Sequence, residues 1–170
     1  MIFVFDSSPL IYLARVGALH LITKIPAQLF LPPIVYNEVV IKGRELGYPD
    51  AEIVDQYVKN EVFSLKVPDI EQILKYDGLK RDLHKGEIEV LALADQLHGT
   101  AIIDDRIGRE IGEMFLVETR GSFFILFYLT AKKEISKDEA MQIVNTMISE
   151  GFRIGVEQYK EIIKLISQIP

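Results

Sequence analysis

The sequence contains no cysteine among its 170 residues. It therefore cannot form disulfides, use a thiolate nucleophile or build a zinc site with sulfur ligands. The absence of cysteine suits the reducing cytoplasm, where we expect the protein to reside. The segment Met1–Asp6 lacks the basic flank and the long apolar core of a signal peptide.

Long apolar runs and excess positive charge are also missing. The longest uncharged apolar run, Gly121 to Ala131, is about half as long as a membrane-spanning helix requires. We expect it to form a buried helix, with no membrane partner. The formal net charge is −6, which argues against nonspecific nucleic-acid binding driven by overall positive charge. Any contact with a polyanion must then come from local basic groups.

The composition is that of a folded protein. Hydrophobic residues make up 49% of the chain and charged residues 26%, which excludes general disorder. No repeat, linker or low-complexity stretch interrupts the chain, and its length suits one compact core. We therefore expect residues 1–170 to form a single domain.

Short apolar runs alternate with helical patterns along most of the chain. We predict strands at residues 2–5, 28–31, 62–67, 101–103 and 115–117. We predict helices at residues 9–14, 34–41, 50–60, 69–76, 85–98 and 107–114, with a loop at 43–49 and Gly99 as the left-handed residue after one helix. The last part, about residues 120–170, looks wholly helical. This order predicts an α/β fold with a central, mostly parallel sheet and a helical carboxyl-terminal extension.

Aspartates follow two of the predicted strands. Asp6 comes directly after the first strand, and Asp104 and Asp105 come after the strand at 101–103. Ligands of open parallel sheets bind outside the carboxyl ends of the strands, so neighbouring strands would bring these carboxylates into one crevice. Helix capping or turn formation is an equally good explanation for each aspartate taken singly.

Two glutamates interrupt apolar helix faces. Glu38 has apolar residues at i−4, i−3 and i+3, and Glu87 has them at i+3, i+4 and i+7. Burying a glutamate is costly unless it is paired with a base or bound to a metal. A buried ion pair with arginine or lysine is the structural alternative at each position. Glu89 faces elsewhere, and we expect it to be solvated.

Convergence of these carboxylates would favour a cation site. Two carboxylates 4 Å apart repel each other by roughly 4 kcal/mol at an effective dielectric of 20. A cluster of four must therefore take up protons or bind a cation. Oxygen ligands without histidine or cysteine favour a hard ion, Mg²⁺ or Mn²⁺.

At these residues the chain resembles a known family. The matching stretches are residues 6–11, 31–38, 86–94, 103–109, 119–124 and 151–154. In this order and spacing they resemble the PIN-domain nucleases, and most closely an archaeal and bacterial subgroup related to the VapC toxins of toxin–antitoxin pairs. The resemblance implies a three-layer α/β/α fold. It also implies an acidic quartet of Asp6, Glu38, Glu87 and Asp105, with Asp104 beside it.

The resemblance further implies a metal-dependent ribonuclease. Asp6, Glu87 and Asp105 would be direct ligands of Mg²⁺ or Mn²⁺, with Asp104 beside them, and Glu38 a ligand through water or a general base. Basic and hydroxyl groups near the quartet are candidates for contacting RNA: Ser7, Ser8, Lys80, Arg81, His84, Lys85, Arg106 and Arg109. A small antitoxin protein and a second copy of the chain are the further expected partners. The chain departs from many relatives at Ile103, Asp104, Glu118 and Gly155.

Two alternatives remain. A PIN-like module that binds RNA or assembles without cleaving would keep the fold and lose the chemistry. Phosphatases and phosphoacceptor domains also place an aspartate at a strand end. A haloacid-dehalogenase-type site would need a second aspartate where Ser8 stands, and a receiver domain would need the reverse order of single and paired aspartates.

Overall fold

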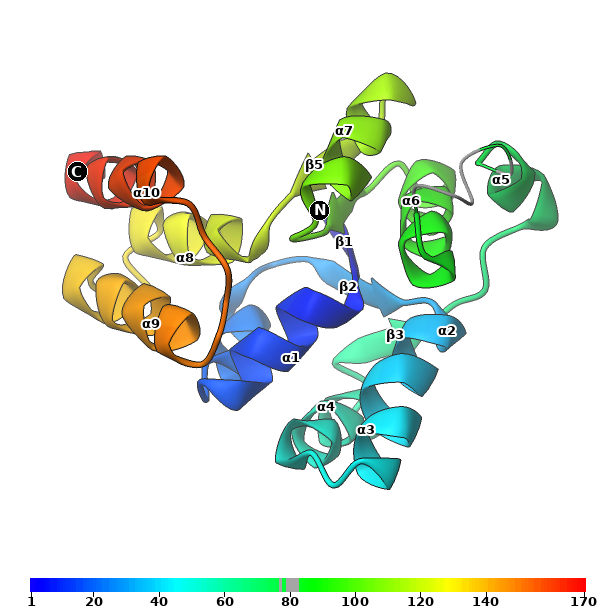
Figure 1. Cartoon of the computed structure of the whole chain (residues 1–170), viewed down its shortest axis with the longest axis horizontal. Helices are drawn as coiled ribbons and strands as arrows, with labels where there is room; N and C mark the ends of the chain where they lie inside the picture. The colour runs from blue at the N-terminus through cyan, green and yellow to red at the C-terminus, as the bar shows by residue number, and fades with distance from the viewer. Residues whose placement is uncertain (77, 79–82) are drawn as a thin grey trace.

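A parallel β-sheet lies at the centre of the molecule (Figure 1). The computed structural model describes residues 1–76, 78 and 83–170. Within these residues the sheet has five strands in the order β3-β2-β1-β4-β5, and every neighbouring pair is parallel. The strands are β1 (Ile2–Phe5), β2 (Gln28–Leu31), β3 (Phe63–Leu65), β4 (Thr100–Ile102) and β5 (Glu118–Arg120). β1 and β4 are apolar because helices cover both faces of a parallel sheet.

The strand order reverses between β1 and β4. From β1 the chain proceeds outward through β2 to β3, then returns to β4 on the other side of β1 and continues to β5. Parallel strands are joined by right-handed crossovers, so the two halves of the sheet have their helices on opposite faces. The carboxyl ends of β1 and β4 therefore flank the point where α/β proteins commonly bind ligands.

The helices follow this rule. α1 (Ser7–Arg15) and α4 (Pro49–Lys59) pack together beside the β1-β2-β3 half, and α4 contacts β3. On the other face α6 (Lys85–Leu97) packs on β1 and β4, while α7 (Arg106–Met114) packs on β5. This arrangement confirms the predicted PIN-like three-layer α/β/α fold. The shorter elements are η1 (Leu19–Lys24), α2 (Pro33–Tyr36), the π turn η2 (Asn37–Ile41), α3 (Lys42–Glu45) and α5 (Ile70–Leu74).

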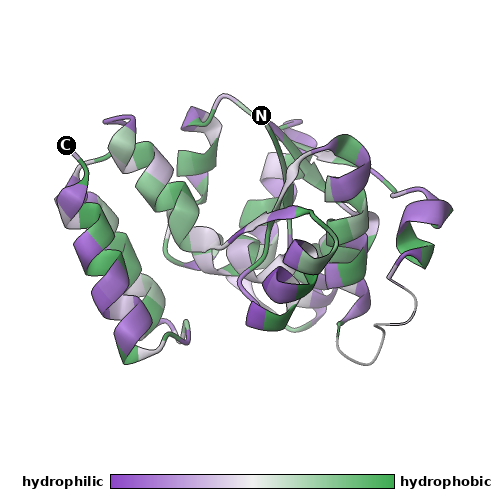
Figure 2. Ribbon diagram, turned by 90° about the horizontal axis from the view of Figure 1, so that it is seen from above, coloured by the Kyte–Doolittle hydropathy of each residue, from purple (hydrophilic) through white to green (hydrophobic). Residues whose placement is uncertain are grey.

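Three helices form the carboxyl-terminal part, as predicted: α8 (Ser122–Ala131), α9 (Lys137–Ser149) and α10 (Val156–Gln168). They pack on one another to one side of the sheet, and α8 also contacts η1 (Figures 1 and 2). α8 is apolar on most sides because it lies between the sheet and the other two helices. The edge-to-face packing of Phe3 in β1 on Phe124 in α8, with ring centroids 6.0 Å apart, joins this part to the sheet. None of the helices described has the length and apolar character to cross a membrane.

Several local predictions were wrong. The strand expected at residues 115–117 lies at 118–120, because Leu116 has a left-handed backbone (φ 59°) and ends the preceding helix. His98, and not Gly99, takes the left-handed conformation after α6. Gly99 is instead needed for space, since a β-carbon there would lie 2.8 Å from Cγ2 of Ile2.

The segment after β2 also differs from the prediction. The helix predicted at 34–41 contains a π turn and continues through α3, so the expected loop at 43–49 is helical in its first part. The helix predicted at 50–60 begins one residue earlier, at Pro49. Asp50, in its first turn, is buried, and its carboxylate lies 3.7 Å from Nη2 of Arg15.

Candidate active site

Asp6 lies at the carboxyl end of β1, where the strand order reverses. Its backbone N–H donates to the carbonyl oxygen of Ile102, 3.0 Å away, so the turn after β1 is fixed to the end of β4. Asp6 precedes α1, yet its side chain accepts no capping hydrogen bond there. The capping alternative does not explain this aspartate. Asp6 is buried, with 7% of the residue exposed, and it lines the cavity described below.

Glu38 reaches the same region from the π turn. The extra residue in a π turn rotates the following residues relative to a regular helix, which explains why Ile41, predicted to be buried, is exposed. The Glu38 carboxylate faces the first turn of α6, where a β-carbon at Gly86 would lie 3.1 Å from Oε2. Ser7 Oγ donates to Oε2 over 2.7 Å and holds the carboxylate on the α1 side.

Glu87 lies in the first turn of α6 and is buried. Its Oε2 accepts from the backbone N–H of His84 over 2.8 Å, so one oxygen caps the helix. Oε1 faces α7, 3.8 Å from the position of a β-carbon at Gly108. This glutamate thus combines a structural hydrogen bond with a second oxygen directed at the turn after β4.

Asp105 and Asp104 occupy that turn and have different partners. Asp105 caps α7, because its Oδ2 accepts from the backbone N–H of Gly108 over 2.8 Å. Asp104 points to the other side and binds Ser122 with both oxygens, at 2.7 Å to the backbone nitrogen and 2.6 Å to Oγ. Helix capping, the alternative explanation from the sequence, therefore applies to one oxygen of Asp105.

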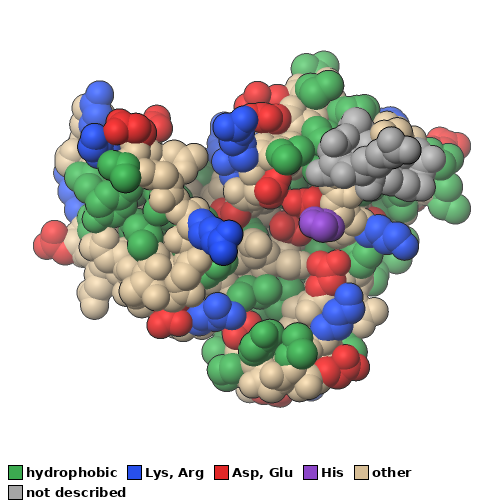
Figure 3. All heavy atoms as spheres, in the orientation of Figure 1, with side chains coloured by type: hydrophobic (Ala, Val, Ile, Leu, Met, Phe, Trp, Pro, Cys, Tyr) green, Lys and Arg blue, Asp and Glu red, His purple; other side chains and the backbone are tan. Residues whose placement is uncertain are grey.

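Three members of the predicted quartet line one cavity of about 470 Å³, which we call the acidic cavity. Asp105 does not line this cavity; it lies next to Glu87, since Oε1 of Glu87 and Cβ of Asp105 are both within 4 Å of where a β-carbon at Gly108 would lie. In the space-filling view acidic side chains gather in a hollow at the middle of this face, and basic side chains surround it (Figure 3). The residues lining the acidic cavity are Asp6, Ser7, Ser8, Ile34, Asn37, Glu38, Lys42, His84, Lys85, Gly86 and Glu87.

Asp6 is the most perturbed of these carboxyl groups. Its pKa is raised from 3.8 to about 7: burial is the largest cause, the charges of Glu87, Glu38 and Asp104 add to it, and the Ser7 backbone N–H opposes the rise. Burial is also the largest cause of the raised pKa of Glu87, with Asp105 and Glu38 contributing. None of the four quartet carboxylates forms a salt bridge with another described residue. The ion-pair alternative is therefore not supported within the described part of the chain.

The donor set fits a hard divalent cation in its chemistry. Carboxylates from three other elements, the π turn, α6 and the turn after β4, act on Asp6, and its burial disfavours ionisation without a positive charge nearby. Across residues 1–76, 78 and 83–170, no group of three or more histidine, cysteine or acidic side chains is already arranged to hold a metal. One oxygen each of Glu38, Glu87 and Asp105 is occupied by Ser7, His84 and Gly108. The other oxygen of each is the one available to a cation.

The predicted RNA-contacting residues divide into two groups. Ser7, Ser8, His84 and Lys85 line the acidic cavity. Arg106 is exposed and pairs with Glu110 on α7, with Nε 2.9 Å from Oε1.

Arg109 turns to the other side of the β4 turn, where its Nη1 donates to the carbonyl oxygens of Ile103 and Asp104. Lys80 and Arg81 lie outside the described residues.

Sequence reasoning missed several contributors to the site. Asn37 and Lys42 line the acidic cavity, one at the start of the π turn and one directly after it. Glu89 was expected to be solvated, but it is half-buried, and burial and the charge of Glu38 raise its pKa. Glu118 lies outside the site, at the start of β5, where it pairs with Arg120 over 2.9 Å and accepts from Thr100. Of these residues, only Glu89 gave a signal in the sequence: its helical position predicted an exposed side chain, which is not what the structure shows.

Comparison with known proteins agrees with this geometry. The chain matches no curated protein by sequence. Among solved structures, the crystal structure of PAE2754 from Pyrobaculum aerophilum is similar, with a TM-score of 0.54 and 16% identity over 77% of this chain and 99% of that one. At this identity the likeness shows the fold alone. The profile of the family DUF3368, described as a PIN domain, matches residues 2–168, and the chain therefore belongs to this family of PIN domains.

Proposed function

We propose that this protein is a metal-dependent endoribonuclease that hydrolyses RNA phosphodiester bonds in the acidic cavity. The observation that carries the proposal is the group of carboxylates around Asp6, which comes from β1, the π turn, α6 and the turn after β4. These carboxylates have no basic partner among the described residues, and Asp6 is held far from its ordinary pKa. PIN domains are generally nucleases, and such a site is suited to hydrolysis of a phosphodiester.

Asp6, Glu87 and Asp105 are the proposed direct ligands of Mg²⁺ or Mn²⁺, and Asp104 is an outer member of the group. A bound divalent ion polarises the phosphodiester and makes water a better nucleophile at neutral pH. Glu38, whose carboxylate accepts a hydrogen bond from Ser7 and is half-buried, would accept a proton from the attacking water or bind the ion through water. Ser7 is thereby a positioning residue, because it orients Glu38.

Cations around the acidic cavity would hold the RNA backbone. Lys85 at the start of α6 and Lys42 after the π turn line the cavity and offer ammonium groups to phosphate oxygens. His84, beside Lys85, adds a further donor when protonated. The overall negative charge of the chain does not oppose this binding locally, because a bound cation reverses the sign of the site.

Replacing Asp6 tests the proposal. Asp6→Asn keeps the volume of the side chain and removes its charge, so Mn²⁺-dependent cleavage of a labelled single-stranded RNA should fall to background. Asp138→Asn makes the same chemical change on the exposed first turn of α9 and should leave cleavage unchanged. Equal activity of the two variants would remove the proposed mechanism.

A PIN-like module that binds RNA without cleaving it is the second candidate. It is favoured by one observation, namely that no group of three acidic side chains in the described part of the chain is already arranged for a metal. Isothermal titration with Mn²⁺ separates the two candidates. The nuclease requires a site that disappears in Asp6→Asn, whereas a binding module requires none.

The likeness to VapC extends the proposal to biology. The chain would act in the cytoplasm as the toxin of a toxin–antitoxin pair, with a small antitoxin covering the acidic cavity. A homodimer is part of the same proposal. Co-expression with the product of a small neighbouring reading frame, followed by co-purification and an RNA cleavage assay, tests the antitoxin; light scattering tests the dimer.

A further inference from the structure

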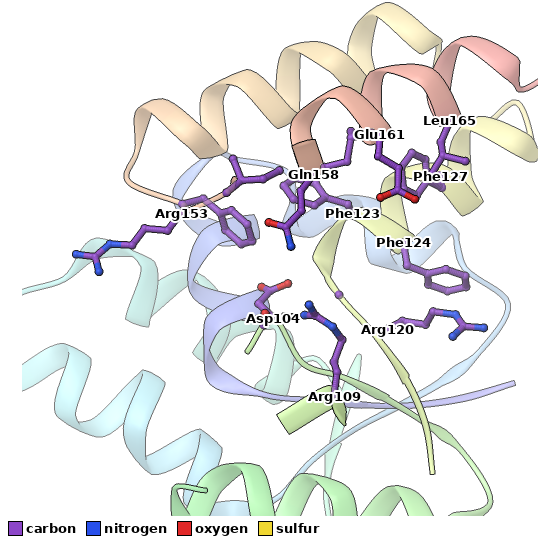
Figure 4. A pocket seen from close by; sticks show the side chains of 14 residues that line it. Asp104, Arg109, Arg120, Phe123, Phe124, Phe127, Arg153, Gln158, Glu161 and Leu165 are labelled. Carbon is purple, nitrogen blue, oxygen red and sulfur yellow. Dashed lines mark hydrogen bonds between the residues drawn. The ribbon is translucent and has the colours of Figure 1, made fainter. Parts of the chain in front are cut away.

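A second cavity lies across the Asp104–Asp105 turn from the acidic cavity. It has a volume of about 320 Å³ and lies between α10 and the turn after β4, with the start of α8 at one side. We call it the arginine–phenylalanine cleft, after the lining residues Arg109, Arg120, Arg153, Phe123, Phe124 and Phe152 (Figure 4). Asp104 lines this cleft, and the next residue, Asp105, belongs to the acidic site. Asp104 also acts on the pKa of Asp6, which lines the acidic cavity, so the cleft and the acidic cavity are neighbours at the turn after β4.

Three arginines line the cleft: the guanidinium of Arg109 points into it, and those of Arg153 and Arg120 point outward at its two ends (Figure 4). Arg109 uses Nη1 to hold the carbonyl oxygens of Ile103 and Asp104, which fixes its position. Arg153 is exposed and forms no salt bridge with another described residue. Arginines spaced along a cleft in this way suit successive phosphates of an extended chain.

Aromatic rings line the same cleft. Phe152 packs edge-to-face against Phe123 with centroids 5.0 Å apart, and both rings are half-buried. At the other end Arg120 stacks over the Phe124 ring, 5.6 Å from its centroid. Aromatic faces and arginine planes beside a positive track are the features with which proteins stack unpaired bases.

The acidic groups facing the arginines are accounted for. Both oxygens of Asp104 accept hydrogen bonds from Ser122, which hold the carboxylate in place, and its charge faces Arg109. Glu161 on α10 is the remaining carboxylate among the lining residues, against three arginines. Gln158 accepts from Gly155 with Oε1 and keeps its amide N–H groups for a ligand. Arg120 is paired with Glu118, and the charge of Arg109 acts on Asp104, so Arg153 is the arginine of the cleft with no salt bridge to a described residue and no such pairing.

We propose that the arginine–phenylalanine cleft binds an unpaired nucleotide of single-stranded RNA beside the phosphate that is cleaved. This inference rests on the proposed nuclease function for its orientation, because the acidic cavity sets where the scissile phosphate lies. The base stacks on the Phe152–Phe123 pair, and Arg153 and Arg109 contact the flanking phosphates. A paired base cannot enter, since bases of an A-form duplex remain stacked inside the helix. The carboxyl-terminal helices therefore select single-stranded substrates.

Binding without metal tests the cleft apart from catalysis. The probe is a short single-stranded RNA without self-complementarity, labelled with fluorescein and followed by fluorescence anisotropy in EDTA over a series of KCl concentrations. Arg153→Ala and Phe152→Leu should each weaken binding by about 10-fold or more. Arg153→Ala should also reduce the slope of log K against log salt by about 0.7, the loss of one phosphate contact.

Lys164→Ala is the matched control, because it removes a charge from α10 at a residue that does not line the cleft. Its affinity and salt slope should equal those of the wild type. A duplex of the same sequence should bind more weakly and respond to neither Phe152→Leu nor Lys164→Ala. Phe152→Leu loses the packing of the ring on Tyr12 and can therefore impair folding. Arg153 is exposed, so Arg153→Ala is expected to fold and keeps the test available.

The outcomes separate the two proposals. Arg153→Ala binding that is indistinguishable from Lys164→Ala binding would overturn the cleft, whether or not the protein cleaves RNA. Weakened binding by the cleft variants, in a protein that cleaves no RNA with Mn²⁺, would support the cleft and overturn the nuclease. The cleft proposal would also be overturned if Phe152→Leu weakened binding of the duplex more than binding of the single-stranded RNA.

Discussion

Gly86 and Glu38 approach each other so closely that a β-carbon at Gly86 would lie 3.1 Å from Oε2 of the glutamate. The glycine opens α6 at the point where the carboxylate needs space. Gly86→Ala should therefore displace Glu38 and lower Mn²⁺-dependent cleavage by about 10- to 100-fold. Stability should not fall, because alanine is the better helix former.

Gly155→Ala is the control for this change. A β-carbon there meets only Oε1 of Gln158, at an ordinary 3.6 Å. Its cleavage rate should equal that of the wild type. Full activity of Gly86→Ala would show that the position of Glu38 does not matter for the reaction.

Asp6 should make stability fall as pH rises. Its pKa is raised in the folded protein from 3.8 to about 7, so the folded state binds more protons than the unfolded state between these values. In EDTA the wild type should lose stability from about pH 4 to pH 7, with about 4 kcal/mol as the upper limit for a shift of roughly three units.

The variant Asp6→Asn lacks this titration. In urea denaturation with EDTA it should be more stable than the wild type at pH 8 and similar to it at pH 4. Mn²⁺ should stabilise the wild type at pH 8 and leave the variant unchanged. A variant less stable than the wild type at pH 8 would contradict the burial of an unneutralised carboxylate.

Asp55 should show the opposite pH dependence. It is buried and accepts from Lys59, Tyr36 and Arg44, and these hydrogen bonds lower its pKa to about 2, the Lys59 contact being the largest cause. Its contribution to stability is therefore present above about pH 4 and lost as pH falls toward 2. Asp55→Asn should destabilise the protein by about 1–3 kcal/mol at pH 7 in urea denaturation.

Glu52→Gln serves as the comparison for Asp55→Asn. Glu52 binds the same Arg44 with Oε2 at 2.9 Å but is exposed, so its loss should cost less than about 1 kcal/mol. Equal effects of the two variants at pH 7 would mean that burial adds nothing to the Asp55 network.

Asp104 and Asp105 should respond differently to substitution by asparagine. Asp104→Asn loses an acceptor for Ser122 Oγ and should cost about 1–3 kcal/mol in stability. Asp105→Asn keeps a capping oxygen for Gly108, since asparagine caps helices as well as aspartate does, and should weaken Mn²⁺ binding instead. Thermal unfolding measures the stability of both variants, and calorimetry measures their affinity for Mn²⁺. A larger loss of Mn²⁺ affinity in Asp104→Asn than in Asp105→Asn would contradict this prediction.

The fold and the location of the acidic site could be predicted from local patterns. Asp6 and Asp105 follow apolar runs of strand length, and a parallel sheet brings such ends together. Glu38 was found from its place on an apolar helix face, although the π turn altered which neighbours are buried. Glu87 was found in the same way, but its second role as a cap of α6 was not, because capping depends on the chain direction before the helix.

The arginine–phenylalanine cleft could not be predicted. Arg153 is far from Arg109 and Arg120 in sequence, and the three line one cavity because α10 packs over the turn after β4. The sequence pattern of α10 indicates an amphipathic helix but not the surface it faces. The contact of Asp104 with Ser122 could not be predicted either, because it depends on where α8 begins relative to β4.

Calorimetric titration of Mn²⁺ into the wild type and Asp6→Asn tests the central claim most directly. The claim is that the carboxylates around Asp6 form one cation site. The wild type should bind Mn²⁺ with release of protons near pH 7, where Asp6 is partly protonated, and Asp6→Asn should show no such binding. Identical Mn²⁺ isotherms for the two proteins would contradict the account.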